Sequence, residues 1–472
     1  MNIFKYKITY AFSILILIFF IGLLKGPIVP DEIQSKNCAR NVDLPFNFGV
    51  TLNCDSGIYL RLASDLTLLF ESSRVVNDRI YTPGNVEQST PGSTLIVWLI
   101  SKPIIYVWNH FDFFTKNLVT DVKSSLNTVY EQLNIDQTID DSFANFNDLI
   151  PIYIGYTIFN ALILFFCFQL YLRILKIYSF DDNTSIYICV LIGMIILIND
   201  VNKQFFYSPG PQIFRIFCPI FTIYFAVRIL EDRKCQNEYL LGSLVTGFFM
   251  LFYYIFFVSF VTITFTFILS QKKKILNLIN VTTLKMLFFS SSLFIIPSLV
   301  WFLICYLINH SVLIADMSHD GFGFFILVEK FNSIGFLKTF LFFIDSIIRT
   351  FHHSLIHSWM IVFLFFFPFL LKKLNLNYYQ KDLLKICSFF SLFSILFFSF
   401  YSPITSRMVF SSFLVFLPFI GEISRIVFKD IKFKNLFFSF YFVIFIFYTV
   451  NTILKTEPFG WYNEKGSYFF IR

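Results

Sequence analysis

Two acidic residues in the N-terminal part of the chain are candidates for a general base in a group-transfer reaction. Asp31 follows the first apolar run closely, and Asp55 lies in the polar segment Asn53-Cys54-Asp55-Ser56-Gly57. A carboxylate held near a membrane surface can act as the general base that takes a proton from an acceptor. Asp55 also precedes a segment with helical periodicity, so capping that helix is an alternative role, compatible with the first.

Four cationic residues are candidates for holding a departing phosphate. They are expected on the side of the membrane opposite the main basic clusters, and they are Arg61, Lys203, Arg215 and Arg407. Cationic side chains form strong hydrogen bonds to phosphate oxygens. Cytoplasmic loops contain most of the positive charge, so an arginine on the other side, such as Arg407, is unusual and indicates a functional role. Snorkelling of Arg407 toward the interface is the alternative interpretation.

Two tyrosines are candidates for lining a substrate groove. Tyr59 begins a segment that extends to Phe70 and carries apolar residues with helical spacing, which predicts an amphipathic helix at the membrane interface. Tyr207 lies in the polar loop 199–212, which contains Pro-Gly-Pro. An ordinary connection between two helices is the alternative for this loop.

A divalent cation is the one cofactor that the sequence leaves open. Asp316, His319 and Asp320 are weak candidate ligands on one outer segment, and His353 and His357 are spaced to share a helix face. No Glu accompanies the histidine pair in the metalloprotease arrangement, and no cysteine spacing matches a zinc site. Interfacial polar contacts are the alternative role of these side chains, so we expect either no cofactor or a divalent cation.

The elements that must position these residues are membrane helices. The 472 residues are 56% hydrophobic and only 14% charged, and 70 of them are Phe, which one water-soluble core does not accommodate. We therefore predict an all-α, polytopic transmembrane bundle of about eleven spans, with interfacial helices in the first outer loop. The apolar runs fall near residues 8–25, 149–172, 186–199, 211–228, 240–270, 286–308, 354–371, 386–401, 408–422 and 436–454.

Basic residues predict the topology of these spans. The formal charge of +7 sits in short clusters at the ends of apolar runs, which excludes a nucleic-acid partner and places the N-terminus and the short basic loops in the cytoplasm. The run 240–270 has a basic cluster at each end, so it should form two short helices that turn near Tyr253-Tyr254. If the later basic clusters are to remain cytoplasmic, the run 91–108 should be re-entrant or interfacial, with a true span as the alternative.

The remaining polar sequence is then on the outer face. We expect residues 1–472 to form a single integral membrane domain, in which residues 27–148 are a large extracytoplasmic loop region. Cys38 and Cys54 lie in that region, where they either form a disulfide or remain two thiols. Codon-biased use of Phe, Ile, Lys and Asn is typical of an AT-rich genome and favours a bacterial cytoplasmic membrane.

This combination resembles the GT-C glycosyltransferases, a superfamily of integral membrane enzymes. The likeness rests on the acidic first outer loop with Asp31-Glu32, the predicted topology, and Arg407 ahead of Leu417-Pro418-Phe419 late in the chain. Here Met408 follows the arginine where the family pattern has Tyr. The resemblance implies an enzyme that moves a sugar from a polyprenyl-phosphate donor to an extracytoplasmic acceptor in the cell envelope, with Asp55 or Asp31 as base and Arg407 on the phosphate.

Two other functions remain as alternatives. A transporter or flippase of lipid-linked glycans would be expected to show paired repeats and ionisable residues at mid-membrane, and neither is prominent. A polysaccharide polymerase or ligase would carry its large outer loop late in the chain, whereas the longest outer segment here follows the first apolar run.

Overall fold

The computed structural model describes about half of the chain, in two compact units. The described residues are 40–44, 48–52, 59–60, 62–70, 74–76, 79–81, 90–110, 120, 148–177, 209–231, 235–271, 281–309, 323–357, 378–401 and 410–419. Unit 1 comprises Met1–Phe165, Ile198–Ile213 and Val443–Gly460, and unit 2 comprises Phe166–Leu197, Phe214–Phe442 and Trp461–Arg472. Each unit is described by itself.

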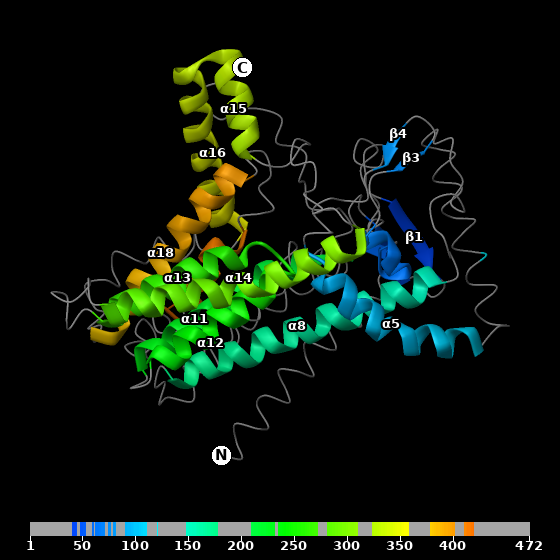
Figure 1. Cartoon of the computed structure of the whole chain (residues 1–472), viewed down its shortest axis with the longest axis horizontal. Helices are drawn as coiled ribbons and strands as arrows, with labels where there is room; N and C mark the ends of the chain where they lie inside the picture. The colour runs from blue at the N-terminus through cyan, green and yellow to red at the C-terminus, as the bar shows by residue number, and fades with distance from the viewer. Residues whose placement is uncertain are drawn as a thin grey trace, which may run out of the picture. The chain divides into compact units, whose positions relative to one another are not determined.

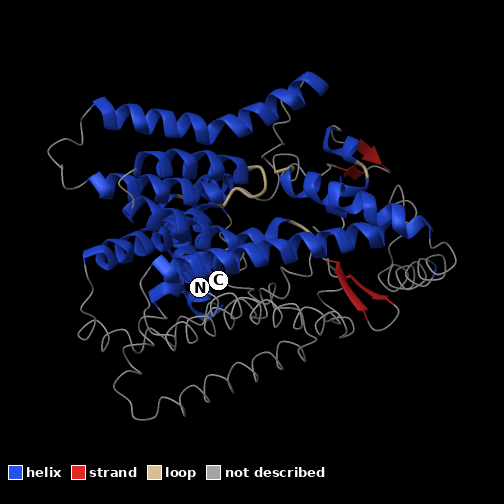
Figure 2. Cartoon of the chain, turned by 90° about the horizontal axis from the view of Figure 1, so that it is seen from below, coloured by secondary structure: helices blue, strands red, loops and turns tan. Residues whose placement is uncertain are grey.

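Most described residues are helical (Figure 2). Four helices are long and apolar enough to cross a membrane: Ile150–Ile174, Pro211–Glu231, Val281–Ile308 and Tyr379–Ser399. Each coincides with an apolar run singled out in the sequence, which is consistent with an integral membrane protein. The predicted runs 8–25, 186–199 and 436–454 lie outside the described residues, so the total of about eleven spans stays a prediction.

Unit 1 contains two small antiparallel hairpins and two helices. Strands β1 (Arg40–Leu44) and β2 (Phe48–Leu52) pair with Arg40 opposite Leu52, and β3 (Arg74–Val76) pairs with β4 (Arg79–Tyr81). Helix α5 (Gly92–His110) lies against the first part of α8 (Leu149–Ile177), where the Ser101 side chain occupies the space beside Gly155. Glycine suits this close approach, because a Cβ there would lie 2.1 Å from the serine oxygen and the serine side chain would have to shift.

The segment predicted as one interfacial helix from Tyr59 onward is broken at Asp65. Residues 59–60 and 62–64 are helical, and a separate 3₁₀ helix, η2 (Leu66–Phe70), follows. The break has a local cause, because the Asp65 carboxylate accepts hydrogen bonds from the backbone N–H and the hydroxyl of Thr67 at 2.9 and 2.7 Å. Leu60, Leu62 and Leu69 of this segment are fully buried.

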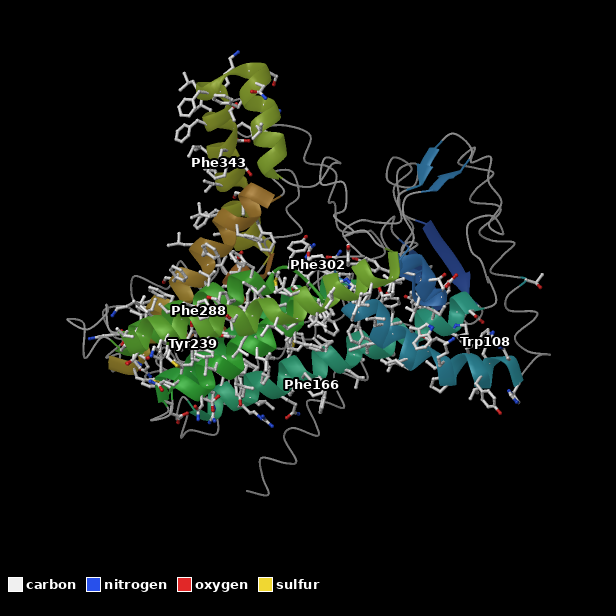
Figure 3. The ribbon with its side chains drawn as sticks, viewed as in Figure 1. Trp108, Phe166, Tyr239, Phe288, Phe302 and Phe343 are labelled. Carbon is white, nitrogen blue, oxygen red and sulfur yellow. The ribbon has the colours of Figure 1, made fainter. Side chains whose placement is uncertain are left out.

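Unit 2 is a bundle of packed helices (Figure 1). Its elements are α11 (Phe214–Glu231), which follows the 3₁₀ helix η4 (Pro211–Ile213) of unit 1, α12 (Cys235–Met250), α13 (Phe256–Ser270), α14 (Val281–Asn309), α15 (Gly323–Ile334), α16 (Phe336–His357), α18 (Tyr378–Tyr401) and the 3₁₀ helix η7 (Phe410–Phe416). The centre is α11, which is 83% buried over its apolar window together with η4, whereas the window of α14 is only 17% buried. Phe288, labelled in Figure 3, is one of the exposed residues of α14.

Helices α12 and α13 form an antiparallel hairpin, as the basic clusters at both ends of the run 240–270 predict. The turn 251–255 joins them, and at the other end the Gln271 amide donates to the Cys235 sulfur at 3.4 Å. Between these ends the ring of Tyr239 stacks on Phe267 with centroids 4.3 Å apart (Tyr239 is labelled in Figure 3). With 16 and 15 residues, each helix is about 23 Å long, shorter than a typical bilayer core.

Candidate functional site

The one candidate phosphate-binding cation that the structure describes, Arg215, is deeply buried. It is the second residue of α11, and only 1% of its side chain surface is exposed. Pro211 begins the 3₁₀ turn from which α11 continues, because proline presets the backbone angle of a first helical turn. Arg215 therefore presents its guanidinium at the beginning of the most buried helix of the bundle.

Tyr253 holds this guanidinium. The arginine Nε donates to the tyrosine hydroxyl at 2.6 Å, and the guanidinium carbon lies 5.3 Å from the centre of the tyrosine ring. Tyr253 belongs to the turn between α12 and α13 and is itself only 3% exposed. The contact therefore joins the start of one helix to the turn of the neighbouring hairpin.

The electrostatic setting of Arg215 favours an anion. The first turn of a helix carries the positive end of the helix dipole, so a cation there is disfavoured and a negative group is favoured. Apolar surroundings raise the free-energy cost of a buried charge, and the hydroxyl of Tyr253 accepts a hydrogen bond from the guanidinium. A phosphate at this position would gain from both the arginine and the helix start.

The opposite end of the same bundle gathers basic residues. There Arg228, near the end of α11, forms an ion pair of 2.7 Å with Glu238 of α12. The hydroxyl of Tyr379, at the start of α18, donates to the carbonyl of Val227 at 3.0 Å, which places the N-terminal end of α18 beside it. Exposed Lys381 and Lys385 belong to that end of α18. Arg215 is thus separated from the basic end by the length of α11.

Tyr59, predicted to line a substrate groove, is a packed residue of unit 1. Its side chain is only 4% exposed, and its carbonyl accepts a hydrogen bond of 3.3 Å from the Tyr156 hydroxyl of α8. Its ring also lies against Gly210, where an added Cβ would come within 3.0 Å of two ring atoms. Tyr59 therefore anchors the segment that follows Asp55 in the chain to α8 and to the 209–213 turn.

The other predicted site residues lie outside the described residues. These are Asp31, Asp55, Arg61, Lys203, Tyr207, Asp316, His319, Asp320 and Arg407. Arg215 belongs to unit 2 and Tyr59 to unit 1, and they are the two members of the predicted site that lie within the described residues. Within the described ranges, no group of three His, Cys, Asp or Glu side chains is arranged to hold a metal ion.

Sequence reasoning missed the partner of Arg215. It identified Tyr253 only as part of a turn. A tyrosine in the turn of a helical hairpin places a polar hydroxyl at the end of two apolar helices, and this position was the signal that could have pointed to its role. It also missed a set of buried hydroxyls on one face of α5. The side-chain oxygens of Ser93, Thr94 and Ser101 are buried without a hydrogen-bond partner, as is the amide oxygen of Gln212. Such groups are places where ordered water binds.

Comparison with protein-family models, with curated proteins and with solved structures gives no match to this chain.

Proposed function

We propose that the protein is a membrane glycosyltransferase that moves a sugar from a polyprenyl-phosphate donor to an acceptor on the extracytoplasmic face. The observation that carries the proposal is the buried Arg215, held by Tyr253 at the start of α11. The donor combines a long apolar chain with an anionic phosphate. A cation at the end of an apolar membrane helix matches that combination of an apolar chain and an anionic phosphate. Because Arg215 is only 1% exposed, donor binding in this proposal requires the Tyr253 turn to move and uncover the guanidinium.

The distribution of charge supports an extracytoplasmic site. Cytoplasmic loops are enriched in Lys and Arg, and one end of the bundle contains Arg228, Lys381 and Lys385, of which Arg228 and Lys385 pair with the carboxylates Glu238 and Asp382. In the proposal this end faces the cytoplasm. Arg215 and the Tyr253 turn, at the other end of α11, then face outward, on the side where the long polar segments of the sequence are expected.

The proposed reaction is a single displacement with inversion at the anomeric carbon. Asp55, or alternatively Asp31, takes the proton of the acceptor hydroxyl, and the acceptor oxygen forms a bond to the anomeric carbon. The bond from that carbon to the phosphate oxygen breaks, and its electron pair leaves with the polyprenyl phosphate. Arg215, together with Arg407 in the resemblance to GT-C enzymes, stabilises the negative charge that develops on the leaving phosphate.

The test is donor turnover by the purified full-length protein in proteoliposomes. A panel of radiolabelled polyprenyl-phosphate sugars is supplied, and transferred or released sugar is measured for the wild type and for Arg215→Gln. Removal of one group that stabilises transition-state charge typically lowers the rate by about 100-fold or more. The matched control is Arg228→Gln on the same helix, which removes a cation from the opposite end, far from the proposed site, and should leave turnover within about three-fold because this partly buried ion pair does not contact the donor.

Two further variants sharpen the result. Asp55→Asn should abolish transfer while leaving donor binding intact, since the base is needed only for the chemical step. Tyr253→Phe keeps the ring beside Arg215 and removes only the hydrogen-bond acceptor, so we expect an intermediate loss. Turnover in Arg215→Gln equal to that of the wild type would exclude Arg215 from the site. Movement of an intact donor across the bilayer without bond cleavage would show that the protein is a flippase rather than a glycosyltransferase.

A further inference from the structure

Helices α15 and α16 form a hairpin that lies largely outside the apolar runs predicted to span the membrane. Gly335 joins them in a left-handed backbone conformation (φ +80°), and its N–H donates to the carbonyl of Phe331, which ends α15. The two helices contact each other (Figure 1). Near the turn, the Lys330 ammonium lies 4.6 Å from the centre of the Phe342 ring.

The polar residues of α16 point into the protein. Asp345 is fully buried, and Ser346 and Thr350 are 2% and 7% exposed. Ser346 donates to the carbonyl of Ser399 near the end of α18 at 3.4 Å, and the Ser399 hydroxyl donates to Thr350 at 3.3 Å. The polar stripe of α16 is therefore used in packing against α18.

The apolar residues of the hairpin point away from the protein. On α16, Phe336 is 71% exposed, Leu337 69% and Phe340 50%. On α15, Val328 and Phe331 are also exposed, at 42% and 49%. A buried carboxylate on one face and exposed aromatic rings on the other is the reverse of the pattern of a helix in water, where the apolar face packs inward.

We propose that the α15–α16 hairpin is embedded in the lipid bilayer, with this exposed apolar face in contact with acyl chains. Polar residues of membrane helices face the protein interior, as Asp345 does here, and lipid is the surrounding that makes the outward apolar face favourable. The inference does not depend on the proposed enzymatic function.

Lipid, rather than a second protein, is favoured as the occupant by continuity with the other apolar surfaces of unit 2. Exposed Ile348 and Phe351 extend the apolar surface of α16 toward its contact with α18, which itself exposes Leu392 and Leu396. The helix α18 is one of the four candidate spans, so in this proposal its exposed apolar side chains also face acyl chains. Lys338, exposed one residue after Leu337, has a long side chain that can reach lipid headgroups.

The test uses the full chain in proteoliposomes with a photoreactive, diazirine-bearing amino acid at single positions. Leu337 and Phe340 represent the proposed lipid face, and Thr339, 8% exposed, is the matched inward control on the same helix. Leu303 of α14, 56% exposed on a candidate span, is the positive control. After illumination, mass spectrometry separates adducts to phospholipid, to protein and to water.

We expect phospholipid adducts at positions 337 and 340 in yields similar to position 303, and about an order of magnitude above position 339, in line with exposed fractions of 69% and 8% for Leu337 and Thr339. As an independent measurement, Leu337→Cys should react with a charged, membrane-impermeant maleimide far more slowly than the same variant unfolded in detergent. Water or protein adducts dominating at 337 and 340, or fast maleimide labelling, would overturn the proposal.

Discussion

The close crossing of α12 and α14 at Gly247 provides the sharpest test of the packing in unit 2. A Cβ at Gly247 would lie 2.2 Å from the carbonyl oxygen of Phe294 and 2.8 Å from its carbonyl carbon. Unstrained contacts of carbon begin near about 3.5 Å, so Gly247→Ala requires the two helices to separate by roughly 1 Å. Because the obstacle is backbone, no change of side-chain rotamer relieves it.

The magnitude follows from two opposing terms. Overpacking of a tight interior costs about 1–3 kcal/mol, and a clash with backbone belongs at the upper end. Alanine in a helix interior gains about 1 kcal/mol over glycine. We therefore expect Gly247→Ala to lower the free energy of unfolding by about 1–2 kcal/mol.

Gly242→Ala, five residues earlier on the same helix, is the matched control. The atoms nearest to its Cβ are side-chain carbons, Phe225 Cδ1 at 3.0 Å and Ile263 Cγ2 at 3.5 Å, which can shift. The helix-propensity gain then offsets the packing cost, and we expect a change between zero and about 1 kcal/mol of stabilisation.

The assay is the thermal unfolding midpoint of the detergent-purified protein, followed by the loss of its monodisperse size-exclusion peak. With about 2–4 °C per kcal/mol for a large domain, Gly247→Ala should unfold about 4–8 °C below Gly242→Ala. A Gly247→Ala protein as stable as Gly242→Ala would show that α12 and α14 do not cross as closely as described.

Two further predictions concern a strained turn and a covalent link. Gly210→Ala should destabilise the protein more than Gly335→Ala, because both glycines have positive φ but only Gly210 also faces a packed ring; melting curves that coincide would contradict this. Cys38 and Cys54 lie outside the described residues, each two positions beyond the terminal pair of the β1–β2 ladder. We expect a disulfide between them in protein isolated without reductant, and intact mass spectrometry that finds both cysteines alkylated by iodoacetamide would refute it.

Part of the site could be anticipated from the sequence, and the missing part has a physical reason. Arg215 was identified because a cation away from the basic loops is an anomaly of composition, which needs no coordinates to detect. Its hydrogen bond to Tyr253 joins residues 38 positions apart and depends on how α11 packs against the α12–α13 turn. Similarly, Tyr59 stands out as an aromatic near a carboxylate, but its burial against Gly210 and Tyr156 is a result of packing.

The amino-acid sequence by itself determined where the long apolar helices lie and that the run 240–270 folds back on itself. Both follow from local quantities. The length of an apolar run determines whether a helix can span the bilayer, and the basic residues at its ends determine on which side each end lies. Only the tertiary structure decided which side of each helix is buried. The periodicity of α16 separates its polar side from its apolar side but does not say which side packs against the protein. In water the apolar side packs inward, whereas in lipid the polar side does. The burial of Asp345, with Leu337 left exposed, is the observation on which the proposal of a lipid surrounding rests.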